Sequence, residues 1–278
     1  MPERMDQGPD RRAGDDPFSP LRSIARTIYG TDAMGYAAGR PDYPPRIYEI
    51  LTKRCGLRRG SHVVEIGAGT GLVTRHLLGV GARVTTVEPD PRMAEYLRTT
   101  VGDVEVIFDT FERARLPEDH FDLVVAATSF HWVDQAIGLR KLRQVLRPGG
   151  WSALWWTIFN DAESADSFRD VLAERLGEED PGGQRNVGFQ LDSEARCSAL
   201  RATAGLDEVT AETIRWSKAM NAAQLRNLYG SLINIRRQSP DEQRRVLDVV
   251  KAVAEDDFDG VVRRPFVTVL YTGRCPIW

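Results

Sequence analysis

The stretch Val63-Val64-Glu65-Ile66-Gly67-Ala68-Gly69-Thr70-Gly71 decides the fold of this chain. A short apolar run passes into three glycines on alternate residues, and an amphipathic segment over residues 72–78 follows. This order predicts a β-strand, a tight glycine turn and an α-helix. A turn of this kind lets the backbone approach a ligand closely, and it offers the ligand the free N–H groups of a helix start.

Two acidic residues accompany the turn. Glu65 lies two positions before the first glycine, and Glu88 ends the next predicted strand, residues 83–87. An acid about 20 residues after such a turn binds ribose hydroxyls in nucleotide-binding folds. The glycines follow the spacing Gly-x-Gly-x-Gly, whereas dinucleotide-binding turns have Gly-x-Gly-x-x-Gly. The spacing therefore counts against an NAD-dependent oxidoreductase, which remains the alternative from another enzyme class.

The turn and its acids resemble motif I and the following acidic strand end of class I S-adenosylmethionine-dependent methyltransferases. The resemblance implies that S-adenosyl-L-methionine is the cofactor and S-adenosyl-L-homocysteine the product. It implies that Glu65 lies toward the methionine end of the cofactor and that Glu88 holds both ribose hydroxyls. The turn would line the cofactor with Gly67, Ala68, Gly69, Thr70 and Gly71.

Strands and helices alternate after the turn. The predicted strands cover residues 62–66, 83–87, 104–108, 121–127, 151–157, 206–216 and 267–271. Alternation of this kind predicts a parallel sheet with helices on both faces. The expected fold class is therefore α/β, with a Rossmann-like sheet of seven mostly parallel strands, an antiparallel last strand and an added helical cap.

Further motifs carry the resemblance from about residue 36 to about residue 157. They are Tyr-x-x-x-Arg-Pro-x-Tyr-Pro at residues 36–44, Phe-Asp-x-Val at 121–124 and Leu-x-Pro-Gly-Gly at 146–150. The first motif implies that Tyr36 and Arg40 lie near the methionine carboxylate of the cofactor. A surface segment with a packed tyrosine is the alternative.

The resemblance also implies a side of the site that holds the adenine. Asp109, at the end of a predicted strand, would accept a hydrogen bond from the adenine amino group, and Met93 would pack on the ring. Ordinary core packing is the alternative for Met93. The remaining residues implied to bind the cofactor are Pro89, Thr110, Phe111 and Ala127.

His131 is the candidate catalytic residue. It follows the predicted strand 121–127, at the edge where an open α/β sheet places its ligand crevice. A histidine titrates near neutral pH, so His131 is the candidate general base if the acceptor must lose a proton. The alternative is a structural histidine packed beside Trp132. Trp155 and Trp156 are neighbours on one strand and face opposite sides, so at most one of them is expected to line a pocket.

The methyl acceptor is expected to be a small molecule, such as a natural-product or carboxylate substrate. The cofactor half is similar to trans-aconitate methyltransferase, which esterifies a carboxylate, and to the ubiquinone/menaquinone-type methyltransferase domain. Arg226, Arg236 and Arg237 are candidates to bind a carboxylate, and solvated arginines are the alternative. A fold that binds S-adenosylmethionine without methyl transfer, in a cyclase-like or regulatory role, also stays open.

Composition changes along the chain predict its organisation. We expect a disordered leader over residues 1–20 and a helical lid segment over residues 21–58. The cofactor-binding core would cover residues 59–160. Residues 161–278 would complete the sheet, with cap helices inserted at about 218–260.

The whole chain has an ordinary globular composition. Its 278 residues carry a net charge of −3 and are 42% hydrophobic. The acidic balance argues against a nucleic-acid partner, and no apolar stretch is long enough to span a membrane. Three scattered cysteines form neither a disulfide framework nor a metal site, and no export signal is apparent. We therefore expect a cytoplasmic protein without a metal, as a monomer or homodimer.

Overall fold

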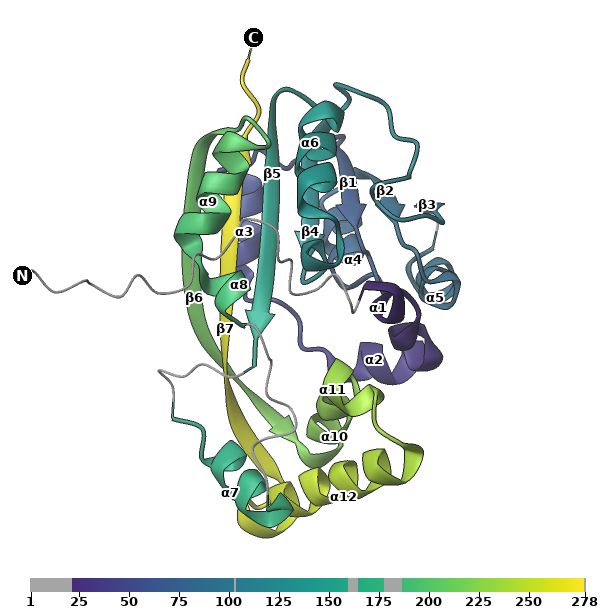
Figure 1. The fold of residues 1–278 in the computed structure, drawn as a ribbon, viewed down its shortest axis with the longest axis vertical. Helices are drawn as coiled ribbons and strands as arrows, with labels where there is room; N and C mark the ends of the chain where they lie inside the picture. Colours follow the sequence, from purple (N-terminus) through teal and green to yellow (C-terminus); the bar gives the residue numbers. More distant parts are fainter. Residues whose placement is uncertain (1–21, 103, 160–164, 178–186, 278) are drawn as a thin grey trace, which may run out of the picture.

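The computed structural model describes residues 22–102, 104–159, 165–177 and 187–277 (Figure 1). Its sheet has seven strands in the order β3-β2-β1-β4-β5-β7-β6. Strands β1 to β5 are parallel, and β7 is antiparallel to both of its neighbours, β5 and β6. The strands are β1 His62–Ile66, β2 Arg83–Val87, β3 Glu105–Ile107, β4 Phe121–Ala127, β5 Leu146–Ile158, β6 Asp207–Asn221 and β7 Val261–Arg274. The predicted fold class is confirmed.

The helices alternate with the strands and extend the chain at both ends. They are α1 Arg22–Ile28, η2 Tyr29–Asp32, α2 Ala33–Gly39, α3 Pro45–Lys53, α4 Leu72–Gly79, α5 Pro91–Val101, η3 Phe130–Trp132, α6 Gln135–Val145, α7 Ser167–Leu176, α8 Val187–Leu191, α9 Ser193–Ala202, α10 Ala222–Gly230, α11 Ile233–Arg236 and α12 Pro240–Asp257. The predicted leader, residues 1–20, lies outside the described residues.

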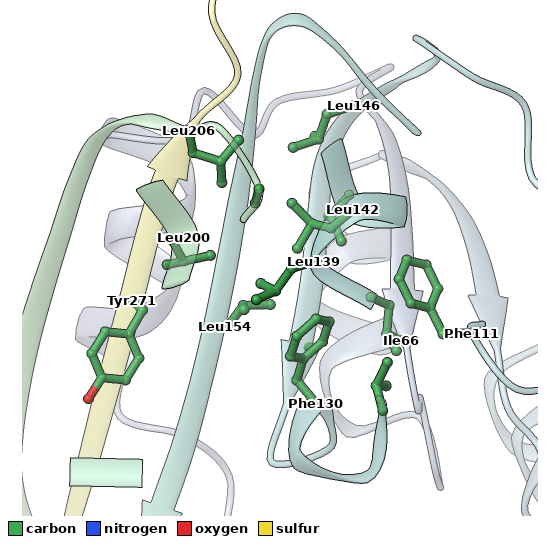
Figure 2. Packing of buried hydrophobic residues seen from close by; sticks show 14 of the residues in the cluster. Ile66, Phe111, Phe130, Leu139, Leu142, Leu146, Leu154, Leu200, Leu206 and Tyr271 are labelled. Atoms are coloured by element: carbon green, nitrogen blue, oxygen red, sulfur yellow. The ribbon is translucent and has the colours of Figure 1, made fainter. Parts of the chain in front are cut away.

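Apolar side chains cover both faces of the sheet. On one face α6 and α9 pack against β1, β4, β5 and β7, and Leu139, Leu142 and Leu200 share one apolar cluster with Ile66 and Leu154 (Figure 2). On the other face α3 and α4 pack against the same strands. The neighbouring tryptophans on β5 face opposite sides of the sheet, as predicted. Trp156 belongs to the first cluster and Trp155 to the second.

The last two strands are longer than the sequence suggested. The predicted strands 206–216 and 267–271 extend to Asn221 and from Val261, because the antiparallel ladder continues from Trp216↔Phe266 to Asn221↔Val261. The ladder bonds satisfy the backbone of a hairpin that runs beyond the parallel strands (Figure 1). The predicted cap segment, 218–260, thus begins inside β6 and ends just before β7.

The far end of this hairpin carries a second hydrophobic core. The far end of the hairpin and the helices α7, α10, α11 and α12 are together called the cap (Figure 1). Its cluster includes Phe168 of α7, Leu225 of α10, Val250 of α12 and Phe266 of β7. A cluster separate from the two sheet cores indicates that the cap has its own source of stability.

Residues 22–40, here called the lid, pack against the cap. A Cβ atom on Gly39 of α2 would lie 2.3 Å from the carbonyl oxygen of Asn227 of α10, so only glycine permits this close approach. Arg236 donates hydrogen bonds to the Ile28 carbonyl and, over 2.9 Å, to Thr31 Oγ1. Lid and cap are therefore joined by both packing and hydrogen bonds. In the described part of the chain, no helix has the length and apolar character needed to cross a membrane.

Candidate functional site

A cavity of about 410 Å³ lies at the carboxyl ends of β1, β2 and β4. Strand ends, the lid and the cap all contribute to its wall. Its lining includes Ile66, Gly67, Gly69, Val87, Glu88 and Ala127 from the strand ends, Tyr29, Tyr36 and Arg40 from the lid, and Leu232, Ile233, Asn234 and Arg237 from the cap. Many of the predicted site residues, from distant parts of the sequence, therefore meet around one space.

Glu88 fixes the glycine turn at one end of this cavity. Its Oε2 accepts a hydrogen bond from the Gly69 N–H at 2.8 Å, and its Oε1 accepts one from the Asp90 N–H at 2.9 Å. Burial raises the pKa of Glu88 to about 7, although these two bonds favour the carboxylate. Each oxygen keeps a further lone pair, so a diol at this position can still bind both.

Glu65 lies deeper, beside a smaller adjoining cavity of about 60 Å³. It is 1% exposed, and Thr74 donates a hydrogen bond to its Oε2 at 2.6 Å. Burial raises the pKa of Glu65 to about 8. Ala68 and Thr70 of the turn line the same small cavity. A buried acid at this point can accept hydrogen bonds or give up a proton when a cationic group arrives.

Arg40 borders both cavities. Its Nη2 donates to the Ser231 carbonyl at 3.0 Å, and its guanidinium lies 4.9 Å from the ring centre of Tyr36 and 5.0 Å from that of Phe159. Its Nε is buried and has no hydrogen-bond partner among the described residues. A buried guanidinium donor without a partner is costly, so this atom fits an anionic ligand group.

The third glycine of the motif serves packing. Gly71 lines neither cavity. A Cβ atom there would lie 2.3 Å from Leu97 and 2.5 Å from Val101, both on α5. Its φ of +80° is in the left-handed region that glycine prefers. This glycine therefore lets α4 start close to α5.

The residues predicted to hold the adenine divide into two sets. Met93, Thr110 and Phe111 line the main cavity, as does Pro89. Asp109 does not line it; its Oδ1 accepts a hydrogen bond from the Thr110 N–H at 2.8 Å and lies 3.5 Å from Arg113 Nε. The role predicted for Asp109 is therefore not supported by its position.

Glu112 is the acid on this wall that the sequence reasoning missed. It lines the cavity, and its Oε1 accepts a hydrogen bond from the Asp134 N–H at 3.0 Å. It follows the predicted Asp109-Thr110-Phe111 group by one residue. A signal was therefore present, because the same strand end offered two acids three residues apart.

Thr128 is a strained residue between the two cavities. Its φ is +56°, which is uncommon for a β-branched residue and costs of order 1–3 kcal/mol. Its N–H donates to the Trp155 carbonyl at 2.7 Å, and its hydroxyl lies 3.2 Å from the Tyr43 hydroxyl. Nothing in the sequence indicated this conformation, which depends on how β5 and the segment after the lid pack together.

His131 lies in η3 and is 7% exposed. Its Nδ1 accepts a hydrogen bond from Trp156 Nε1 at 2.9 Å. Burial lowers the pKa of His131 to about 3, and Arg40 acts in the same direction. The general base stays a prediction, and the bonded Nδ1 lone pair and the disfavoured cationic form both count against it. The sequence showed His131 and Trp156 but not that they touch.

Comparison with known proteins agrees with this geometry. A family model described as a methyltransferase domain matches residues 64–154. Over these residues the chain is similar to a methyltransferase domain. The match covers β1 to most of β5 and includes Glu65, the glycine turn, Glu88 and His131. A methyltransferase domain, rather than a dehydrogenase domain, also favours S-adenosylmethionine over NAD as the cofactor.

Relatives by sequence carry the same description. An uncharacterized methyltransferase of Mycobacterium tuberculosis is 35% identical over 46% of this chain and 51% of its own length. An uncharacterized methyltransferase of Schizosaccharomyces pombe is 26% identical over 90% of this chain and 98% of its own length. This chain spans about half the length of the first curated relatives it matches.

A solved structure supports the fold beyond the matched domain. Phosphoethanolamine N-methyltransferase 2 of Haemonchus contortus superimposes with a TM-score of 0.56 at 15% identity, over 91% of this chain and 59% of that one. That protein was solved with phosphomonomethylethanolamine and S-adenosylhomocysteine. At this identity the likeness concerns the fold alone.

The residues present fit S-adenosylmethionine. The unpartnered Nε of Arg40 suits the methionine carboxylate, and the carboxylate of Glu88 suits a ribose diol. Gly69 has a φ of +57°, and a Cβ built on it meets nothing within 4 Å, so this point of the turn faces open space. The donor set, the acceptor set and the open turn all match the groups of this cofactor.

Proposed function

We propose that this protein transfers the methyl group of S-adenosylmethionine to a small-molecule acceptor bound in the 410 Å³ cavity. The observation that carries the proposal is the mixed lining of this cavity. The glycine turn and Glu88 line it together with Tyr29 of the lid and Ile233 of the cap. A cavity that joins a cofactor-binding turn to residues from outside the sheet suits a two-substrate transfer reaction.

In this proposal Glu88 binds the ribose, Arg40 binds the methionine carboxylate, and Met93 and Phe111 pack on the adenine. When bound, the cofactor supplies an electrophilic methyl carbon on a sulfonium. The chain's own contribution is to orient the acceptor in line with that carbon and to exclude water. Lid and cap residues serve both purposes because they cover the cavity.

The acceptor end favours a molecule with an anionic group. Of the three arginines considered from the sequence, Arg226 pairs with Asp248 at 3.6 Å and Arg236 bonds the lid. Arg237 lines the cavity, and its side chain makes no hydrogen bond or ion pair with the described residues. An unpaired guanidinium beside aromatic walls suits a carboxylate on an aromatic or apolar body.

Other predictions accompany this proposal without a direct test. They are the absence of a nucleic-acid partner, a cytoplasmic location, and a monomeric or homodimeric state. They are independent of the site.

The test is a turnover screen with S-adenosylmethionine carrying an isotopically labelled methyl group. Small aromatic and aliphatic carboxylic acids form one set, and their amides form the matched set without charge. We expect label to appear in a carboxylic acid product together with S-adenosylhomocysteine, and not in the amides. Cofactor binding without label in any product would favour a binding or cyclase-like role instead.

A further inference from the structure

The pairing of His131 with Trp156 defines which ring nitrogen carries the proton. An indole Nε1–H is a donor only, so His131 Nδ1 must offer its lone pair across the 2.9 Å contact. In a neutral imidazole the single ring proton is then on Nε2. A general base acting through Nε2 needs the opposite tautomer, with the proton on Nδ1 and the lone pair on Nε2.

The surroundings of the pair oppose any change of tautomer. Trp156 is 2% exposed and lies in the sheet core, where its ring packs edge-on against Tyr271. His131 sits in a turn held by the Gln135 side-chain amide, which donates to the carbonyls of Phe130 at 2.9 Å and Val133 at 3.0 Å. Neither ring can turn without disturbing packed neighbours, so loss of the contact would leave the indole N–H unsatisfied.

We infer that Trp156 holds His131 as the Nε2–H tautomer, so that His131 is a hydrogen-bond donor that positions the acceptor and not a base that deprotonates it. The inference rests on the proposed function, because it assigns a role at the acceptor end of that cavity. His131, Trp132 and Trp156 all line this space. The matching acceptor offers a lone pair on oxygen or nitrogen to the imidazole N–H.

The charged groups on the cavity wall agree with a neutral His131. They are Arg40, Glu88, Asp90, Glu112 and Arg237. Arg40 is the charge that acts on the histidine, and it opposes a second positive charge there. The acids are already bonded, since Glu88 accepts two backbone N–H groups, Asp90 accepts the Gly30 N–H at 3.0 Å, and Glu112 accepts the Asp134 N–H. Transfer is therefore expected to proceed without a proton moving to His131.

The test in the ligand-free protein is a long-range ¹H–¹⁵N correlation spectrum of the histidine side chains, assigned with His131→Gln. We expect Nε2 of His131 to show the shift of a protonated nitrogen and Nδ1 that of a lone-pair nitrogen, unchanged across the neutral pH range. A protonated Nδ1, or a titration near neutral pH, would overturn the inference whether or not the protein is a methyltransferase.

Two tryptophan variants provide a matched pair. Trp156→Phe removes the indole N–H and should produce a mixture of His131 tautomers. Trp155→Phe is the control, because Trp155 is equally buried on the next residue and its Nε1 has no hydrogen-bond partner among the described residues. It should leave the His131 spectrum unchanged. Identical spectra for wild type and Trp156→Phe would show that Trp156 does not hold the His131 tautomer.

Kinetics with the acceptor found in the turnover screen give a second readout. The side-chain amide in His131→Gln can accept a hydrogen bond from Trp156 and still donate one to an acceptor, but it cannot act as a base. We expect His131→Gln to keep kcat/KM within about tenfold of wild type, with the change mainly in the KM for the acceptor. A loss of roughly 10² to 10⁴ in kcat, equal to that of His131→Ala, would instead identify a base.

Discussion

The parallel half of the sheet and the β6–β7 hairpin bury their apolar residues in different ways. Strand β4 is buried along nearly its whole length, because helices cover both faces of the parallel strands. Strand β6 instead alternates between exposed and partly buried positions, and its far end is covered by the separate core of the cap. Strand ends of the first region and residues of the cap both line the cavity. We propose that the first region binds the cofactor and that the cap contributes to acceptor choice.

The largest effect is expected at the glycine turn. Gly69→Val places a β-branched side chain at a φ of +57° and fills space that faces the ligand. We expect S-adenosylmethionine binding to fall by at least about 100-fold, or roughly 2.7 kcal/mol. Calorimetric titration measures it.

The control for this variant is Gly60→Val. Gly60 also has a positive φ, +82°, with open space around it, but it lies outside both cavities. It shares the backbone strain and should keep cofactor affinity. Equal S-adenosylmethionine affinity in Gly69→Val and wild type would show that the glycine turn does not contact the cofactor.

The cap should respond in stability instead of cofactor affinity. Arg264 and Asp166 form an ion pair at 3.0 Å with side chains 1% and 4% exposed. Arg264→Met leaves a buried carboxylate without its partner, so we expect a loss of about 3–5 kcal/mol in the free energy of unfolding. Urea denaturation measures it, and S-adenosylmethionine affinity of the folded fraction should be unchanged.

The matched variant is Arg175→Met on α7, whose partners Asp256 and Asp257 are exposed. It should cost less than about 1 kcal/mol. Adding Asp166→Leu to Arg264→Met removes both charges and should restore most of the lost stability. A large loss of stability in Arg175→Met and none in Arg264→Met would show that the buried Arg264–Asp166 pair does not stabilise the cap.

The buried acids of the core predict an unusual dependence of stability on pH. The pKa values of Glu65 and Glu88 are raised to about 8 and about 7, whereas the unfolded chain titrates near the ordinary value of 4.5. Between these values the two acids bind more protons in the folded state than in the unfolded state, so the ligand-free protein should lose stability as pH rises from about 5 to 8. Buried, neutral His131 acts in the opposite direction below pH 6.5 and offsets about one of the two acids there, so the loss should be steepest above that pH. Denaturation midpoints across this range measure the slope.

In Glu65→Gln the loss of unfolding free energy between pH 5 and 8 should be smaller by a few kcal/mol, because a neutral amide replaces the group that must ionise. Glu212→Gln on β6 is the control. The pKa of Glu212 is lowered by Arg46, so its contribution is lost only in more acidic solution and the slope between pH 5 and 8 should remain. A slope of the opposite sign in wild type would show that these two acids are ionised in the free protein.

The smallest effect is expected at the rim of the acceptor chamber. Arg237 is exposed and makes no ion pair with the described residues, so Arg237→Ala should change stability by less than about 0.5 kcal/mol. We expect the KM for an anionic acceptor to rise by about tenfold, as loss of a charge-assisted hydrogen bond would cause. Arg226→Ala, on the same cap but away from the cavity, should leave that KM unchanged, and an equal rise in both variants would place the acceptor elsewhere.

The predictability of the two regions differs for a physical reason. Glu65, the glycines and Glu88 could be located from sequence because strand ends of a parallel sheet meet at one edge, so local patterns fix their meeting point. The roles of His131 and Arg40 depended on contacts between distant segments, with Trp156 and Ser231. The cap was harder still, since the length of β6 and β7 is set by their mutual pairing and the Arg264–Asp166 pair joins residues that no local pattern connects.

The most direct test of the account is calorimetric titration of the purified protein with S-adenosylmethionine, S-adenosylhomocysteine and NAD in parallel. We expect micromolar binding of both sulfur ligands, lost in Gly69→Val, and no binding of NAD. Binding of NAD alone would contradict it, because the glycine turn, Arg40 and Glu88 would then serve a different ligand.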